Sequence, residues 1–359
     1  MTDREFSLAV AACRAAYRKQ PASELGPFDE IDWTRLLALV GRHRVVALCW
    51  EGLDGRHGEL PGEIADRFAR DAETSLEQSL RLAAESVRIR RAFDEAGVDL
   101  LFLKGSALAA LAYSDPFLKQ SCDIDILVAP ERLDEAASAL RSADYASVIP
   151  GSSDLLDQWH RRSKESLWRH VTQGFVVDLH TRLTDHHSLL CGIGIDSPRQ
   201  MARLGDSIEL PTLREDENFA YLCVHGASSS WFRLKWLVDL AALLNGKGER
   251  EVERLYRSSQ QLGAGRSAGQ ALLLARQYFG TEVSPILTKE LERDPGVRAL
   301  AAAARAYLGG HRSLGEPTAT LLGTLPLHWA QMLLAPDLKF KWLELLRRFR
   351  GLRTRQWAR

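Results

Sequence analysis

Apolar residues recur at three- and four-residue intervals through residues 6–93, and again from about residue 196 to the end of the chain. This spacing places apolar side chains on one face of an α-helix and predicts two largely helical regions. Residues 71–96 contain few helix breakers and predict one long amphipathic helix. In the later region the strongest helical segments are residues 218–224, 231–244 and 267–278.

A shorter region between them alternates apolar runs with short helical patterns. Strands are predicted at residues 98–103, 123–128, 146–149 and 175–180, and helices at residues 106–113 and 130–143. This order of elements favours a sheet of modest size covered by helices. We therefore expect an α+β fold in which a small mixed-sheet core at residues 94–190 is flanked by a helical region at 1–93 and a helical domain at 191–359.

The composition is that of an ordinary soluble globular protein, with 45% hydrophobic and 26% charged residues among 359. Basic and acidic residues number 47 each, so no global charge attracts nucleic acid or a membrane surface. The five cysteines form no CxxC pair, which argues against a zinc knuckle or a disulfide framework. Neither a secretory signal nor a membrane-spanning segment is recognisable. We expect a cytoplasmic protein.

Two carboxylates mark the strand predicted at residues 123–128. Asp123 and Asp125 are two positions apart and therefore point to the same face of that strand. One strand earlier, Gly105 and Ser106 form a turn before a short helix, where backbone N–H groups bind phosphate well. An Asp-x-Asp pair alone is more often solvent-exposed than functional, but the phosphate turn beside it favours a Mg²⁺ site for nucleotide phosphates.

A third carboxylate, Asp178, interrupts the apolar run at residues 175–180. Because a charge is costly in such a run, we interpret Asp178 as a metal ligand rather than as the ion-pair partner of Arg182 or His180. His180 lies on the same face as Asp178. It is as consistent with a structural role as with a contact to metal, phosphate or Asp178.

These residues resemble the nucleotidyltransferase superfamily with the DNA-polymerase-β-type catalytic core. The segments LKGSALAALAY, DIDILV, VDLHTRL and LCVHGASSSWFRLKWLVDLAALL resemble, more specifically, the bacterial uncharacterised nucleotidyltransferase family. The resemblance implies a polymerase-β-like core in which Gly105 and Ser106 hold the β- and γ-phosphates. It also implies that Asp123, Asp125 and Asp178 bind two Mg²⁺ ions. An acceptor hydroxyl would then attack the α-phosphorus and release pyrophosphate, with Asp178 helping to remove its proton.

Three positions depart from the pattern of these relatives. Lys119 and Cys122 stand where arginine and glycine are usual before the Asp-x-Asp strand, and Ser229 stands where histidine is frequent. Lys119 still offers phosphate a point charge, although it lacks the bidentate fork of arginine. The three aspartates of the expected metal site are retained. The departures therefore bear on the identity of the acceptor and on the level of activity.

A later helical segment holds a further nucleotide-binding candidate. Lys235 is interpreted either as a cation over the triphosphate or as the partner of Asp239, which lies four residues later on the same helix face. Trp231 and Trp236 occur at helical spacing and are interpreted as core residues. His225 is interpreted as a structural residue of the helical domain.

Two basic stretches allow partners other than a nucleotide. Residues 159–164 either line an acceptor pocket or form a solvated loop, which is the commoner case for charged stretches. Residues 339–359 carry eight basic residues against one acid, Glu344, and an apolar stripe that includes Trp342. Such a helix packs its stripe on the domain or, as the less common alternative, rests on an anionic membrane surface.

The sequence thus predicts transfer of a nucleoside monophosphate, most simply AMP from ATP, to a hydroxyl group of a small molecule or a protein. Long nucleic acid is the least favoured acceptor because no strongly basic groove is apparent in the core. The alternative hypothesis is a module that keeps the fold and binds a nucleotide or a partner protein without transferring a group.

Overall fold

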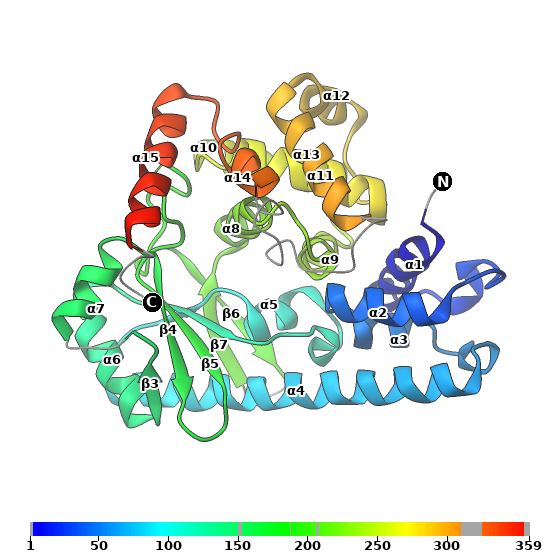
Figure 1. Cartoon of the computed structure of the whole chain (residues 1–359), viewed down its shortest axis with the longest axis horizontal. Helices are drawn as coiled ribbons and strands as arrows, with labels where there is room; N and C mark the ends of the chain where they lie inside the picture. Colours follow the sequence, from blue (N-terminus) through cyan, green and yellow to red (C-terminus); the bar gives the residue numbers. More distant parts are fainter. Residues whose placement is uncertain (1–2, 150–152, 187, 206–207, 310–324, 355–359) are drawn as a thin grey trace.

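The computed structural model describes residues 3–149, 153–186, 188–205, 208–309 and 325–354. Its centre is a mixed sheet of seven strands in the spatial order β3-β4-β5-β2-β1-β7-β6 (Figure 1). The strands are β1 (Leu101–Phe102), β2 (Ile124–Leu127), β3 (Tyr145–Ser147), β4 (Glu165–His170), β5 (Val176–His180), β6 (Arg199–Leu204) and β7 (Ile208–Leu213). Strand pairs β1–β7 and β2–β5 are parallel, and the other neighbouring pairs are antiparallel.

Helices precede, interrupt and follow the strands. Before the sheet come α1 (Arg4–Arg18), α2 (Trp33–His43), α3 (Val46–Gly52) and α4 (Gly62–Glu95). Within it come α5 (Gly105–Ala112), α6 (Leu133–Ser142) and α7 (Ser153–His160). After it come α8 (Glu215–Ser228), α9 (Leu234–Leu243), α10 (Glu249–Gln261), α11 (Gly265–Phe279), α12 (Pro285–Arg293), α13 (Pro295–Leu308), α14 (Leu325–Gln331) and α15 (Leu338–Thr354). The predicted α+β class with helical flanks is confirmed.

Helix α4 joins the two main parts of the molecule. It is 34 residues long and runs beneath both the sheet and the N-terminal helices (Figure 1). Its first half buries Phe68 and Ala72 in a core formed by the helical regions. Its second half buries Leu82, Ile89 and Phe93 against the sheet. The long helix predicted at residues 71–96 is therefore confirmed, and it begins about two and a half turns earlier than predicted.

The N-terminal and C-terminal helices share one hydrophobic core, although the sheet separates them in sequence. Helix α1 contacts both α9 and α11. The ring of Phe6 in α1 lies edge-on to Tyr278 in α11, with 5.5 Å between the ring centroids. Residues from the first quarter of the chain are thereby held beside the domain that follows the sheet. The domain limits of 1–93, 94–190 and 191–359 stay a prediction.

Three strands escaped the sequence analysis. Strand β4 buries Ser166, Trp168 and His170 at alternate positions, so two polar side chains hid its strand-like periodicity. Strands β6 and β7 lie in the region predicted to be helical, and this prediction is wrong for residues 199–204 and 208–213. Pro211 within β7 argues against a strand, and the exposed basic residues of edge strand β6 obscure its alternation. The sheet therefore extends beyond residue 190.

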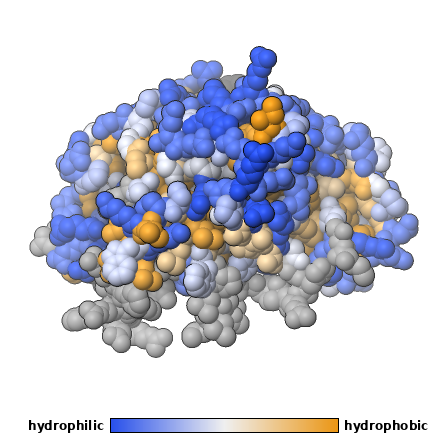
Figure 2. Space-filling model, turned by 90° about the horizontal axis from the view of Figure 1, so that it is seen from above, coloured by the Kyte–Doolittle hydropathy of each residue, from blue (hydrophilic) through white to orange (hydrophobic). Residues whose placement is uncertain are grey.

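Helix α15 packs on the molecule through one side. Phe340 and Glu344 are 2% and 3% exposed, whereas Trp342, predicted to lie in the packing stripe, is 60% exposed. The side chains that follow residue 346 lie outside the described part of the chain. No helix among the described residues is both long and apolar enough to cross a membrane. Figure 2 shows a face on which hydrophobic residues form small patches among hydrophilic ones.

Candidate active site

The three predicted acidic residues lie on or directly before two neighbouring strands at the centre of the sheet. In the parallel pairing of β2 with β5, Asp125 lies directly opposite Asp178. Asp123 immediately precedes β2 and is two positions from Asp125, so it extends the same face. Because paired strands are only about 4.8 Å apart, this register crowds the carboxylates together.

Asp125 is the most deeply buried of these acids, at 2% exposure. Its Oδ1 atom lies 2.8 Å from Nζ of Lys104 and 3.2 Å from Nε2 of His180. Burial favours the neutral acid, but the Lys104 cation and the His180 contact outweigh it and hold the pKa of Asp125 well below its usual value. Its Oδ2 atom has no hydrogen-bond partner among the described residues. The carboxylate is thus ionised, and one of its oxygens makes no hydrogen bond to the described residues.

Asp178 has the opposite electrostatic character. Burial, followed by repulsion from Asp125 and Glu165, raises the pKa of Asp178 to about 7. The nearby Lys104 charge lowers the pKa of Asp178 but does not offset the burial and the repulsion. Asp178 therefore gains most from any positive charge that enters the site.

A small cavity of about 90 Å³ opens beside these acids. It is lined by Arg44, Lys104, Gly105, Leu108, Lys119, Ser121, Asp123, Asp125, Leu222, His225, Lys235, Trp236 and Asp239. The structure thus brings five predicted site residues to one cavity: Gly105, Lys119, Asp123, Asp125 and Lys235. Ligand pockets usually measure about 300–1,000 Å³, so a cavity of this size suits phosphate groups rather than a whole nucleotide.

Lys235 is a buried cation of this cavity that has no anionic partner among the described residues. Its side chain is 9% exposed and forms no hydrogen bond or ion pair with any other described residue. Asp239, the partner considered for it in the sequence analysis, instead lies 3.5 Å from Lys119 and accepts a 2.7 Å hydrogen bond from Tyr113. Burial, and then the nearby Lys119 charge, lower the pKa of Lys235 to about 8. A buried, unpaired ammonium is a strong site for an anion.

Gly105 and Ser106 form the start of α5, as predicted, but they face different spaces. Gly105 adopts φ +58°, a left-handed conformation that favours glycine, and it lines the cavity. A Cβ atom there would meet only the Asp123 carbonyl oxygen at 3.7 Å, so the backbone conformation, rather than space, requires glycine. The Ser106 side chain lines a separate small cavity with Ser79 and Phe117. The structure does not bring Ser106 to the carboxylates.

Several site residues were missed in the sequence analysis. Lys104 directly precedes Gly105 and could have been found from that position, whereas Arg44 comes from the end of α2 and carries no local signal. Glu165 opens the unpredicted strand β4, and its Oε2 lies 3.2 Å from Nε2 of His180. His225, interpreted as structural, lies on the cavity wall.

The predicted Mg²⁺ site was tested against these side chains. The unpartnered Oδ2 of Asp125 and the raised pKa of Asp178 both fit a site that receives a divalent cation. In the arrangement described, however, no three His, Cys, Asp or Glu side chains in the described ranges converge to hold a metal ion. Lys104 already contacts the Asp125 carboxylate, which such an ion would also have to bind. The residue types fit Mg²⁺, and its binding stays a prediction.

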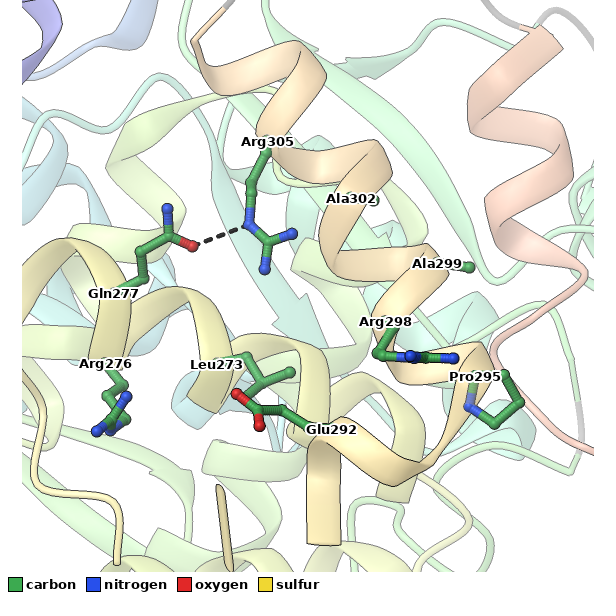
Figure 3. Close-up of a pocket in the computed structure, with 9 residues that line it drawn as sticks. All are labelled: Leu273, Arg276, Gln277, Glu292, Pro295, Arg298, Ala299, Ala302 and Arg305. Carbon is green, nitrogen blue, oxygen red and sulfur yellow. Dashed lines mark hydrogen bonds between the residues drawn. The ribbon is translucent and has the colours of Figure 1, made fainter. Parts of the chain in front are cut away.

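A larger hollow, of about 950 Å³, lies elsewhere on the helical domain (Figure 3). It is lined by residues of α11, α12 and α13, among them Arg276, Arg298, Arg305 and Glu292. The one hydrogen bond drawn across it joins Arg305 to Gln277 at 2.8 Å (Figure 3). The hollow shares no lining residue with the carboxylate cavity, so its size does not make it the reaction site.

Comparison with known protein families gives a match over most of the chain. The family model described as "Uncharacterised nucleotidyltransferase" matches residues 29–280, more than half of the chain. The matched span contains every residue that lines the carboxylate cavity. No curated protein matches the sequence.

Proposed function

Because this chain belongs to the uncharacterised nucleotidyltransferase family, we propose that it transfers a nucleoside monophosphate from a nucleoside triphosphate to an acceptor hydroxyl group. ATP is the first donor to test, and the acceptor is a small molecule or a protein side chain. Pyrophosphate is the leaving group. Family membership supports the class of reaction, and the donor and acceptor are our inference.

The observation that carries the proposal is the cavity in which cations meet the acidic strand. Arg44, Lys104, Lys119 and Lys235 line one small space together with Asp123 and Asp125. Of these cations, Lys235 is buried and has no anionic partner in the described structure. A triphosphate beside a divalent cation would satisfy both kinds of charge at once, because phosphate oxygens bind ammonium and guanidinium groups and carboxylates bind a metal ion.

Each group then has a defined task. The N-terminus of α5 at Gly105 and the Lys119 and Lys235 side chains bind and orient the phosphates. Asp123, Asp125 and Asp178 would hold Mg²⁺, which supplies charge stabilisation to the phosphates when it is bound. The acceptor oxygen attacks the α-phosphorus, and the bond to the bridging oxygen breaks towards pyrophosphate. Asp178 accepts the hydroxyl proton.

One observation favours a second candidate function. The ion pair between Lys104 and Asp125 already neutralises the most buried acid of the triad at 2.8 Å. A protein that kept this pair closed would bind nucleotide without transferring it. The second candidate is therefore a nucleotide-binding module with little or no catalytic activity.

Labelled nucleotides distinguish the candidates. Wild-type protein is incubated with Mg²⁺, a cell extract as the source of acceptor, and ATP labelled at either the α- or the γ-phosphate. We expect acceptor labelling from α-labelled ATP only, and its loss in an Asp123→Asn/Asp125→Asn double variant. Glu292→Gln, on the remote hollow of Figure 3, is the matched control and should retain wild-type transfer.

Two outcomes contradict the proposal. Labelling from γ-labelled ATP would mean phosphoryl transfer, and equal labelling by the double variant would mean that the acidic strand is not the reaction site. Tight ATP binding with no labelling of any acceptor would favour the binding module.

A further inference from the structure

A second cavity, of about 320 Å³, adjoins the site through His225, which lines both spaces. Its walls come from the start of β4, the segment after β5, helix α8, and helices α14 and α15. We propose that this cavity is the acceptor site and that it takes a small hydroxyl compound carrying a positively charged amino group. The inference rests on the proposed function, because it names the molecule that receives the nucleotide.

Helix α8 connects the two cavities. Tyr221, Val224, His225 and Ser228 are spaced by three or four residues, so they form one face of the helix, and all four line the second cavity. His225 continues into the phosphate cavity. A molecule in the second cavity is therefore separated from the phosphate site by a shared side chain rather than by a layer of core residues.

A short chain of polar contacts also links the second cavity to the acids. Glu165 lines the cavity, and its Oε2 lies 3.2 Å from Nε2 of His180. The same His180 nitrogen lies 3.2 Å from Oδ1 of Asp125. A hydroxyl group bound beside Glu165 is thus close to the strand pair that carries the candidate catalytic acids.

Tyr221 gives an independent indication of a ligand. Its side chain is 2% exposed, and its hydroxyl has no hydrogen-bond partner among the described residues. Leaving a buried hydroxyl unpaired is unfavourable, and a hydroxyl or amine on a bound molecule would satisfy it. Burial raises the pKa of Tyr221, so this group is an O–H donor at neutral pH.

The charges around the cavity select the class of acceptor. Among the residues that the structure describes, its lining includes the carboxylates of Glu165, Asp185 and Glu344 and one full cation, Lys164. Lys164 is already paired with Glu165, and its backbone N–H donates a 2.8 Å hydrogen bond to Asp185. The surplus of negative charge favours a protonated amine and disfavours acceptors that carry phosphate or carboxylate groups.

The C-terminal helices close this cavity. Phe340 and Glu344 of α15 line it, and both are almost fully buried. Gln331 of α14 also lines it and donates a 2.5 Å hydrogen bond to the carbonyl oxygen of Ser228 in α8. Ser229, which directly follows α8, is a further lining residue.

The transfer balances without a further reagent. The acceptor oxygen forms a bond to the α-phosphorus, and the bond between that phosphorus and the bridging oxygen breaks with its electron pair going to pyrophosphate. The hydroxyl proton passes to the Asp178 carboxylate and then to water. The protonated amine of the acceptor stays in the acidic cavity and takes no part in the bond changes.

The test separates a cell extract by charge before the acceptor is known. Small molecules are fractionated by ion exchange into cationic, neutral and anionic pools, and proteins form a fourth pool. Each pool is incubated with the full-length protein, Mg²⁺ and α-labelled ATP. We expect labelled product mainly from the cationic pool.

Two variants then examine the cavity itself. Tyr221→Phe and Glu344→Gln should each raise the KM for the cationic pool about tenfold while leaving the KM for ATP unchanged, because both residues line the acceptor cavity and neither lines the phosphate cavity. A purely structural effect would instead change both KM values together. Glu292→Gln serves as the control and should behave as the wild type.

The inference is overturned if labelling comes mainly from the neutral, anionic or protein pool, or if both variants keep the wild-type KM for the acceptor. In these cases transfer itself still occurs, so the proposed function survives. Absence of labelling in every pool would instead count against both the acceptor site and the proposed function.

Discussion

Replacing Asp178 by asparagine should stabilise the metal-free protein at alkaline pH more than at acidic pH. Asparagine closely matches the size of a protonated aspartate and does not titrate. Burial and the neighbouring carboxylates raise the pKa of Asp178 to about 7 in the folded protein, against an ordinary value of 3.8. The folded state therefore holds a proton that the unfolded chain has already lost between about pH 4 and pH 7.

The sign and size of the effect follow from this difference. Since the folded state binds more protons in this window, the free energy of unfolding falls as pH rises through it and levels off above pH 7. A shift of about three units corresponds to roughly 4 kcal/mol in total. Between pH 5 and pH 8 the asparagine variant should therefore gain roughly 2 to 3 kcal/mol relative to the wild type.

The free energy of unfolding of the wild type and of Asp178→Asn is measured at pH 5 and pH 8 by urea titration, with EDTA present and unfolding followed by circular dichroism. Glu292→Gln removes an exposed carboxylate and should show no such pH-dependent gain. The reasoning is refuted if the difference between Asp178→Asn and the wild type is the same at pH 5 and pH 8. Adding Mg²⁺ at pH 8 should stabilise the wild type more than the variant, and equal stabilisation would contradict a metal-binding role for Asp178.

Three further predictions follow from the packing and charge of the site. Lys104→Met leaves Asp125 buried without its cation and should lower the free energy of unfolding by about 3–5 kcal/mol, measured by urea titration; unchanged stability would show that the ion pair is dispensable. Because the pKa of Lys235 is about 8, ATP affinity measured by calorimetry should fall by up to about tenfold per pH unit above pH 8. Lys235→Met should bind ATP more weakly at pH 7 and lose this dependence, and a variant that kept it would exclude Lys235 as its source. Gly226→Ala places a Cβ atom 2.5 Å from ring atoms of the fully buried Trp231 and should lower the free energy of unfolding by about 1–3 kcal/mol, measured by thermal denaturation. A wild-type melting temperature would mean that α8 can shift to make room at no cost.

Features that depend on neighbouring residues were predictable from the sequence. The apolar spacing that predicted the helix at residues 71–96 is a local pattern, and α4 realises it. The turn at Gly105 and the paired acids of β2 are likewise recognisable from a few adjacent positions. The α+β class follows from the order of such segments.

Strand β4 shows where the local pattern fails. Its buried face consists of Ser166, Trp168 and His170, so its burial has the period of a strand while its hydrophobicity does not. Two of these side chains satisfy their polar atoms inside the fold: Nε1 of Trp168 donates a 3.0 Å hydrogen bond to Ser166. Such partners are visible only after the chain has folded.

The candidate site divides in the same way. The sequence indicated Asp123, Asp125 and Asp178 as a group, but the direct alignment of Asp125 with Asp178 is a property of strand pairing. The Lys119–Asp239 contact replaced the local Lys235–Asp239 pair that helical spacing suggested, because a residue distant in sequence lies closer in space.

By itself, the sequence determined the kinds of element, the fold class and the acidic strand beside a glycine turn, because these depend on side-chain periodicity over a few residues. Only the tertiary structure decided which cations meet the acids. Arg44 reaches the cavity because the N-terminal helices share a hydrophobic core with the C-terminal ones, and Lys235 faces it because α9 packs against α5. Burial then assigns the charge states, since the same low-polarity surroundings raise the pKa of Asp178 and lower that of Lys235.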